Sequence, residues 1–220
     1  MRSNPTNATL AWRIKPLIHA LALAPFALLV YRLLGGTLGF NPVEDLTRET
    51  GIWSLRFLLL CLAITPLRTL TGLYWLTRLR RMLGLYAFFY GLCHFVVYFL
   101  WDQSLDLARV LDDILERPYI TVGAAALGLM VPLAVTSTRA LRRRLRRHWN
   151  RLHRLIYPIG GLVLLHYFWL TRADYREPAV YAVIFVLLLG LRLGSMSRRR
   201  SWAPTKRQRR RNRVVGDESE

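Results

Sequence analysis

Hydrophobic residues in this chain fall in long uninterrupted blocks, and most of the charged residues lie between them. Six blocks stand out, at residues 17–34, 51–69, 83–101, 119–136, 152–171 and 178–194. Each holds about 17–20 residues, which is enough for a helix to cross a hydrocarbon core of about 30 Å. A lone strand leaves its backbone groups unsatisfied in lipid, so helices are expected. The pattern predicts an all-α integral membrane protein, a bundle of six transmembrane helices.

The charges of the connecting segments predict the orientation of this bundle. The segment before the first block carries +3, the 2–3 loop +3, the 4–5 loop +7 and the segment after residue 194 carries +6. The alternate loops carry −2, −3 and 0. Basic segments stay on the cytoplasmic side, so both termini are predicted to be cytoplasmic. We therefore expect a cytoplasmic segment at 1–16, a membrane domain at 17–194 and a basic, disordered cytoplasmic tail at 195–220.

Composition refines this prediction. The chain of 220 residues has a formal net charge of +19, yet 53% of its residues are hydrophobic. Such a basic excess raises the possibility of nucleic-acid binding. Here the excess lies on one predicted membrane face, where orientation and anionic lipid already account for it. We therefore expect a lipid-bilayer protein and no nucleic-acid partner. No internal repeat is evident.

The 3–4 loop has a helical pattern of its own. Leucine, valine and isoleucine recur every three or four residues between 105 and 115, with acidic residues between them and Ser104 as a candidate N-cap. The loop is predicted to form an amphipathic helix. It either lies on the outer leaflet or offers a docking surface to a periplasmic partner.

Two of the five histidines lie at similar depths in different predicted spans. His94 is seven residues from the periplasmic end of its span, about 10 Å deep, and His166 is five residues from its own, about 7 Å deep. Ionisable residues within spans are costly and are functional candidates, and imidazole is a common haem ligand. The pair indicates a haem held near the periplasmic side; packing or hydrogen bonding is the alternative.

A second centre is less well supported by the sequence. His153 lies thirteen residues before His166, about 20 Å away along a helix, and on a straight helix the two rings face different directions. Pro158 lies between them and would alter this by kinking the helix. A second centre also needs a partner ligand for His153. The third span has Arg80 and Arg81, not histidine, at the matching level. His19 in the first span is the only other candidate at that depth. His148 is expected to be a solvated residue of the basic loop.

Arg56 lies about five residues into the second span from the periplasmic side. A buried arginine needs an anion, and haem carries two propionates. Arg56 is therefore predicted either to lie near the periplasmic haem or to extend to the outer headgroups.

Several motifs resemble those of the MsrQ (YedZ) family, the haem-binding membrane subunits of a bacterial periplasmic methionine sulfoxide reductase system. The resemblance covers about residues 15–195. Its motifs are RRMLGLY at 80–86 leading to His94, Thr136-Ser137, HWNRLHRLIY at 148–157 leading to His166, NPV at 41–43, ITPL at 64–67, and His19 ahead of Pro25-Phe26.

This resemblance implies membership of the ferric-reductase-like transmembrane superfamily and a place in the bacterial inner membrane. It implies haem b, FMN, and electrons drawn from the respiratory quinone pool. These electrons would pass to a molybdopterin-containing periplasmic methionine sulfoxide reductase (MsrP), which repairs oxidised proteins. By motif position, His94 and His166 would be the axial pair and His153 an additional haem-linked histidine. No glycine-rich phosphate loop is evident, so FMN rests on the resemblance.

Two other functions compete with an electron-transfer subunit. A free-standing haem oxidoreductase of the ferric reductase or NADPH oxidase type would need nicotinamide and flavin domains, for which 220 residues leave no room. A small-molecule permease would show inverted repeats or broken helices around a midplane site, and neither is seen.

Overall fold

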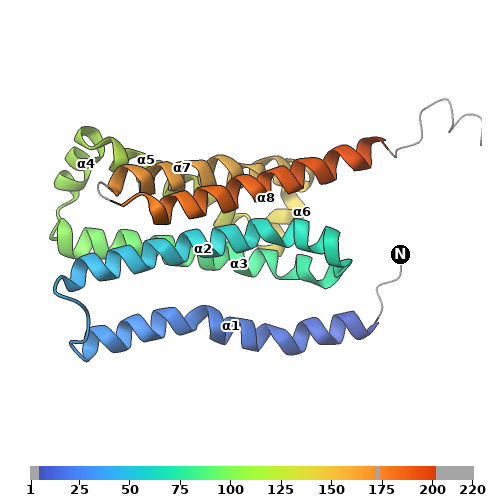
Figure 1. Cartoon of the computed structure of the whole chain (residues 1–220), viewed down its shortest axis with the longest axis horizontal. Helices are drawn as coiled ribbons and strands as arrows, with labels where there is room; N and C mark the ends of the chain where they lie inside the picture. The colour runs from blue at the N-terminus through green and yellow to red at the C-terminus, as the bar shows by residue number, and fades with distance from the viewer. Residues whose placement is uncertain (1–4, 172–173, 202–220) are drawn as a thin grey trace, which may run out of the picture.

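The computed structural model describes residues 5–171 and 174–201, and every regular element within them is helical. The elements in chain order are α1 (Pro5–Leu34), α2 (Pro42–Thr71), η1 (Tyr74–Arg78), α3 (Arg80–Val97), η2 (Tyr98–Asp102), α4 (Leu107–Glu116), α5 (Pro118–Val135), α6 (Arg139–Leu152), η3 (His153–Leu155), α7 (Ile156–Leu170) and α8 (Arg176–Ser201). The long helices run along a common axis, with α1 beside α2 and α3 at one side of the bundle (Figure 1).

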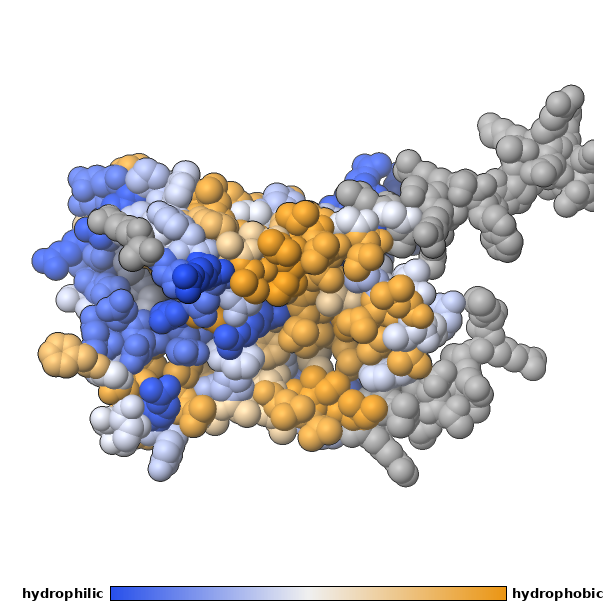
Figure 2. Space-filling view, in the orientation of Figure 1, coloured by the Kyte–Doolittle hydropathy of each residue, from blue (hydrophilic) through white to orange (hydrophobic). Residues whose placement is uncertain are grey.

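Opposite charges occupy opposite ends of this bundle. We call the end with loop 35–41, α4 and the start of α8 the acidic end, and the end with η1 and α6 the basic end (Figure 1). Acidic residues of the described part fall only in 44–49, 102–116 and 174–177, all at the acidic end. Hydrophilic side chains gather at this end and hydrophobic ones over the middle (Figure 2).

Four described helices are long and apolar enough to cross a membrane: Ile14–Leu34, Pro42–Thr71, Arg80–Asp102 and Pro118–Val135. They correspond to the first four predicted spans. The fifth corresponds to α7, which is shorter at 15 residues, and the sixth to α8. The chain is thus an all-α membrane protein, while six spans and cytoplasmic termini remain predictions.

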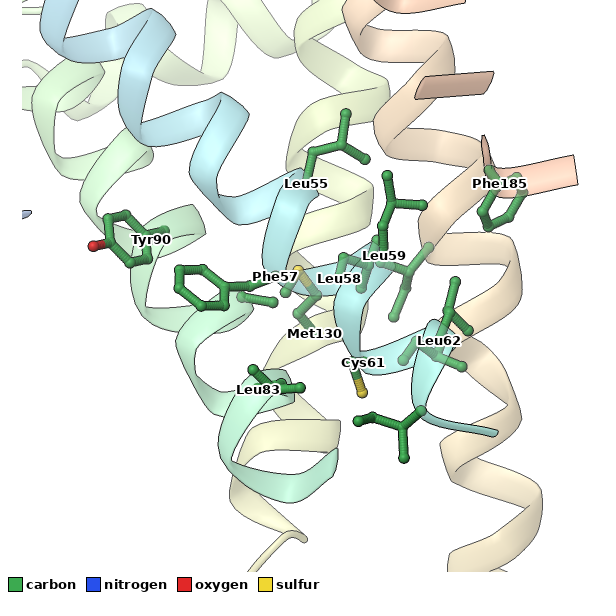
Figure 3. Packing of buried hydrophobic residues seen from close by; sticks show 14 of the residues in the cluster. Leu55, Phe57, Leu58, Leu59, Cys61, Leu62, Leu83, Tyr90, Met130 and Phe185 are labelled. Atoms are coloured by element: carbon green, nitrogen blue, oxygen red, sulfur yellow. The ribbon is translucent and has the colours of Figure 1, made fainter. Parts of the chain in front are cut away.

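The core is centred on α2, which has neighbours on several sides. In the most apolar stretch of α2 61% of residues are buried, against 11–28% for the other three candidate spans. Figure 3 shows the ring of Phe57 directed toward α3, beside Tyr90. The ring of Phe57 stacks on Tyr90 with centroids 5.3 Å apart. Because several helices pack around α2, its apolar residues are not confined to a single stripe.

Local signals fix both ends of α2. The side chain of Asn41 accepts from the backbone N–H of Glu44, and Pro42 occupies the first helical turn. Glu44 and Asp45 add negative charge near the positive end of the helix dipole. At the other end Gly72 adopts a left-handed φ of 70° and its N–H bonds to the carbonyl of Arg68.

A tyrosine hydroxyl joins α1 to α3. The Tyr90 side chain is fully buried, and its hydroxyl donates to the Ala22 carbonyl at 2.8 Å and accepts from the Phe26 N–H at 3.0 Å. In a regular helix the Phe26 N–H would bond to the Ala22 carbonyl directly. Pro25 lies inside α1 beside this turn and lacks an N–H of its own, and the Tyr90 hydroxyl contacts both backbone groups there.

The predicted amphipathic helix in the 3–4 loop is present as α4, but its predicted N-cap is wrong. Asp106, not Ser104, caps the helix and accepts from the N–H groups of Ala108 and Arg109. Ser104 and Leu105 precede it with positive φ values of 52° and 64°, outside the range an N-cap adopts. A turn thus separates η2 from α4.

Residues 139–151 were predicted to lie in a basic loop and instead belong to helix α6, which has a kink at Arg146. Its apolar residues, Leu141, Leu145, Trp149 and Leu152, are half-buried, and the arginines with described side chains are exposed. The indole of Trp149 donates to the Thr136 carbonyl at 3.0 Å. The chain changes direction at η3, before Pro158, so Pro158 lies in the first turn of α7, where proline is tolerated.

At the C-terminus, α8 continues to Ser201, beyond residue 195 where the sequence predicted a disordered tail to begin. The remainder of that predicted tail lies outside the described residues.

Candidate functional site

His94 on α3 and His166 on α7 meet in the acidic half of the bundle. Their ring centroids are 6.1 Å apart and the ring planes are nearly perpendicular, at 85°. Both side chains are half-buried. The structure therefore brings together the two histidines that the sequence placed at one depth.

Each imidazole is held by a backbone carbonyl of a neighbouring helix. His94 Nδ1 bonds to the carbonyl oxygen of Thr47 on α2 at 2.8 Å, and His166 Nδ1 bonds to that of Tyr119 on α5 at 2.6 Å. A carbonyl only accepts, so both Nδ1 atoms carry the proton. Each Nε2 then keeps a free lone pair, the state required of a metal ligand.

This arrangement fits a metal shared by the two rings. A metal–imidazole bond is about 2 Å long and a ring centroid lies about 1 Å beyond the nitrogen, so two axial imidazoles have centroids about 6 Å apart. The observed separation of 6.1 Å agrees with this value. The site supplies two imidazole nitrogens, and the described residues contain no cluster of three or more ligating side chains. Two histidines suffice for haem iron, because the porphyrin supplies the other four nitrogens.

A glycine lies against each ring. A Cβ atom placed on Gly51 would lie 3.0 Å from His94 Nδ1, and one on Gly123 would lie 2.8 Å from His166 Nδ1. Each glycine follows the carbonyl-bearing residue by four positions, and each histidine follows that residue by the same 47 positions. Sequence reading missed this local repeat of carbonyl, glycine and histidine, although the identical spacing was there to be found.

Arg56 faces α8 within the same half of the bundle. Its Nε donates to the hydroxyl of Tyr181 at 2.9 Å, and its guanidinium lies over the ring of Trp53 at 4.7 Å. The side chain is half-buried, and its charge acts on the carboxylate of Glu177. Its predicted role beside a haem propionate remains a prediction.

A polar network joins α2, α7 and α8 next to the histidine pair. Glu177 accepts from the hydroxyl of Tyr167 at 2.8 Å and from the guanidinium of Arg48 at 2.7 Å. These two donors hold the pKa of Glu177 below its ordinary value, so Glu177 is ionised at neutral pH. Tyr167 adjoins His166 in sequence and packs near Tyr181, so the network also contacts the residue bonded to Arg56.

His153 lies at the basic end, in η3, away from the other two histidines. Its ring stacks on Trp149 with centroids 3.9 Å apart, and its Nδ1 is buried without a hydrogen-bond partner in the described part of the chain. Arg80 lies close enough for its charge to act on it. The backbone group that acts on the His153 ring is that of Trp149, four residues earlier in the chain. The rings of His94 and His166 are instead bonded to carbonyls of packed helices that are distant in sequence.

His19 was the one histidine considered as a partner for His153, and the structure gives it a different neighbour. Its Nδ1 lies 2.7 Å from the hydroxyl of Tyr86, and the two rings are 5.7 Å apart. His148 lies on α6 and is exposed, as expected. Within the described residues, the structure does not assemble a second histidine pair.

Comparisons with known proteins agree with this architecture. Residues 50–165 match the family model described as ferric reductase like transmembrane component. A protein of Xanthomonas euvesicatoria pv. vesicatoria (strain 85-10), named protein-methionine-sulfoxide reductase heme-binding subunit MsrQ, is 53% identical over 196 residues, or 86% of this chain and 90% of that protein.

Relatives with the same name occur in other bacteria. That of Xanthomonas oryzae pv. oryzae (strain MAFF 311018) is 53% identical over 184 residues, covering 81% of this chain and 84% of that protein. That of Ralstonia nicotianae (strain ATCC BAA-1114 / GMI1000) is 52% identical over 181 residues, covering 80% and 82%. The chain therefore belongs to the MsrQ family, within the ferric-reductase-like transmembrane proteins.

Proposed function

We propose that this protein is the membrane electron-transfer subunit of a methionine sulfoxide reductase system. It takes electrons from the respiratory quinone pool and delivers them, by way of haem b, to a periplasmic molybdopterin-containing reductase of the MsrP type. The observation that carries the proposal is the His94–His166 pair, whose Nδ1 atoms are both bonded to carbonyls. Family membership supplies the context.

The residues of the chain bind and tune the cofactor rather than act on a substrate bond. When bound, haem supplies a one-electron iron couple. His94 and His166 would hold it through Nε2, while the carbonyls of Thr47 and Tyr119 fix the orientation of the rings. Arg56 would compensate the charge of a propionate. Methionine sulfoxide itself is reduced on the partner, so this chain is not the catalytic subunit.

The finer parts of the proposal follow from family membership and charge. The bundle spans the bacterial inner membrane six times with both termini cytoplasmic, so the acidic end and its histidine pair face the periplasm. His153 serves as an additional haem-linked residue at the basic end. Haem stoichiometry is one or two, and FMN is included on the family resemblance.

Absorption and redox measurements test the proposal. Purified wild-type protein should show a Soret band that shifts on reduction, and His94→Ala and His166→Ala should each lose the low-spin haem signal. His148→Ala, an exposed histidine on α6, is the matched control and should leave the spectrum unchanged. A wild-type protein without haem absorbance would rule the function out.

A second measurement separates an electron-transfer subunit from a free-standing oxidoreductase. The reduced protein should be re-oxidised by the purified periplasmic reductase with methionine sulfoxide present. Re-oxidation only by ferric chelates would favour the other function.

A further inference from the structure

We propose that Gly51 and Gly123 are positioning residues that set the haem potential by leaving a carbonyl open to each axial histidine. The inference rests on the proposed function and adds to it two residues that touch neither the iron nor a substrate. Each acts through the histidine that packs against it.

Helix geometry explains why a glycine is needed at this spacing. In an α-helix the carbonyl of residue i accepts from the N–H of residue i+4, so one of its lone pairs is already used. The second lone pair points outward, beside the Cβ of residue i+4. Gly51 is residue i+4 for Thr47, and Gly123 is residue i+4 for Tyr119. Without a Cβ at these positions, an imidazole from another helix reaches the second lone pair.

The contact distances show how little room is left. A Cβ on Gly123 would lie 2.8 Å from Nδ1 and 2.9 Å from Cε1 of His166, which is closer than such atoms approach in proteins. A Cβ on Gly51 would lie 3.0 Å from Nδ1 and 3.3 Å from Cε1 of His94. Either ring would have to withdraw from its carbonyl, but the ring of His166 would have to withdraw further.

Withdrawal of the ring changes the iron couple. An Nδ1–H bonded to a carbonyl raises the basicity of the imidazole, and a more basic ligand favours ferric iron. Weakening that bond therefore raises the midpoint potential and tilts the ring away from the ligating position. Both half-sites have the same construction, so both substitutions change the potential in the same direction, with the larger change at Gly123.

The test compares Gly51→Ala and Gly123→Ala with Gly128→Ala. Gly128 lies on α5 with Gly123, and a Cβ there would meet no atom within 4 Å. All three changes give the same gain in helix propensity, so the control isolates the contact with histidine. The measurements are haem content, the low-spin signal in electron paramagnetic resonance, and the midpoint potential from a redox titration.

We expect potentials in the order Gly123→Ala above Gly51→Ala above Gly128→Ala, with Gly128→Ala equal to wild type. Haem affinity should fall on the order of tenfold for Gly123→Ala, as is typical when a ligand's supporting hydrogen bond is lost. If Gly123→Ala does not fold, the less crowded Gly51→Ala decides. Potentials and spin states equal to those of Gly128→Ala would overturn this inference, whereas absence of haem from the wild type would overturn the proposed function.

Discussion

Arg56 is a half-buried cation whose positive charge would act on the haem. It is fixed by Tyr181 on one side and Trp53 on the other, so its guanidinium has a defined position. A fixed positive charge near the iron favours the ferrous state, because reduction adds negative charge. The two alternatives for Arg56, pairing with a haem propionate or extension to the headgroups, predict different effects on the haem midpoint potential.

Arg56→Gln should lower the midpoint potential of the haem by tens of millivolts, where about 59 mV corresponds to a tenfold change for one electron. Redox titration of the purified variant measures the shift. Arg78→Gln, in η1 at the basic end, should leave this potential unchanged because its exposed charge is remote and screened. An unchanged potential in Arg56→Gln would indicate that the side chain serves only the headgroups.

The role of a single residue could be predicted from sequence only where its side chain provides the interacting group. His94 and His166 could be predicted to lie together because imidazole is rare within apolar spans and because the helical rise gives their depth. The carbonyls of Thr47 and Tyr119 were missed, since any residue has a carbonyl and only the fold decides which one is open. Gly51 and Gly123 were overlooked because a missing side chain gives no chemical signal.

At the scale of elements, two tyrosine hydroxyls of α3 bond to α1: Tyr90 to the backbone at Ala22 and Phe26, and Tyr86 to the ring of His19. The Tyr90 hydroxyl bonds both to the Phe26 N–H and to the Ala22 carbonyl, so it holds this turn of α1 to α3. Most side chains of residues 14–34, the part of α1 whose burial is described, are exposed. The position of α1 beside the bundle therefore rests on a few contacts.

Tyr90→Phe should destabilise the protein by about 1–3 kcal/mol, the usual effect of leaving buried polar groups unsatisfied. The Phe26 N–H and the Ala22 carbonyl would lose their bridge, and α1 would separate more readily from α3. Thermal unfolding in detergent measures the change. Tyr31→Phe, at a side chain on α1 that is 72% exposed, should have no effect. Equal melting temperatures for the two variants would contradict the bridging role.

The limits of sequence reading at this scale have physical causes. Apolar runs predicted the positions of the long helices, because burial in lipid demands them. Helix α6 was taken for a loop since seven arginines obscured the spacing of Leu141, Leu145 and Trp149. The cap of α4 was misplaced by two residues, because Ser104 and Asp106 are both good N-caps and only the backbone angles distinguish them.

For the whole molecule, the separation of charge predicts which end faces which compartment. Leu111→Cys on α4 and Arg144→Cys on α6 place exposed thiols at the acidic and basic ends. In a chain lacking Cys61 and Cys93, a membrane-impermeant maleimide should label the first in intact spheroplasts. It should label the second only after the membrane is opened. The reverse result would mean that the bundle is inserted the other way round.

The position of the His94–His166 pair near one end of the bundle has an electrical consequence. In the proposed orientation the iron lies close to the outer surface, so an electron that enters from the same side crosses little of the insulating layer. Its delivery would then be almost independent of membrane voltage. An electron that came instead from the cytoplasm would traverse most of the field and gain about 2.3 kcal/mol per 100 mV. Measuring how an imposed membrane voltage changes the extent of haem reduction in vesicles therefore shows from which side of the membrane electrons reach the haem.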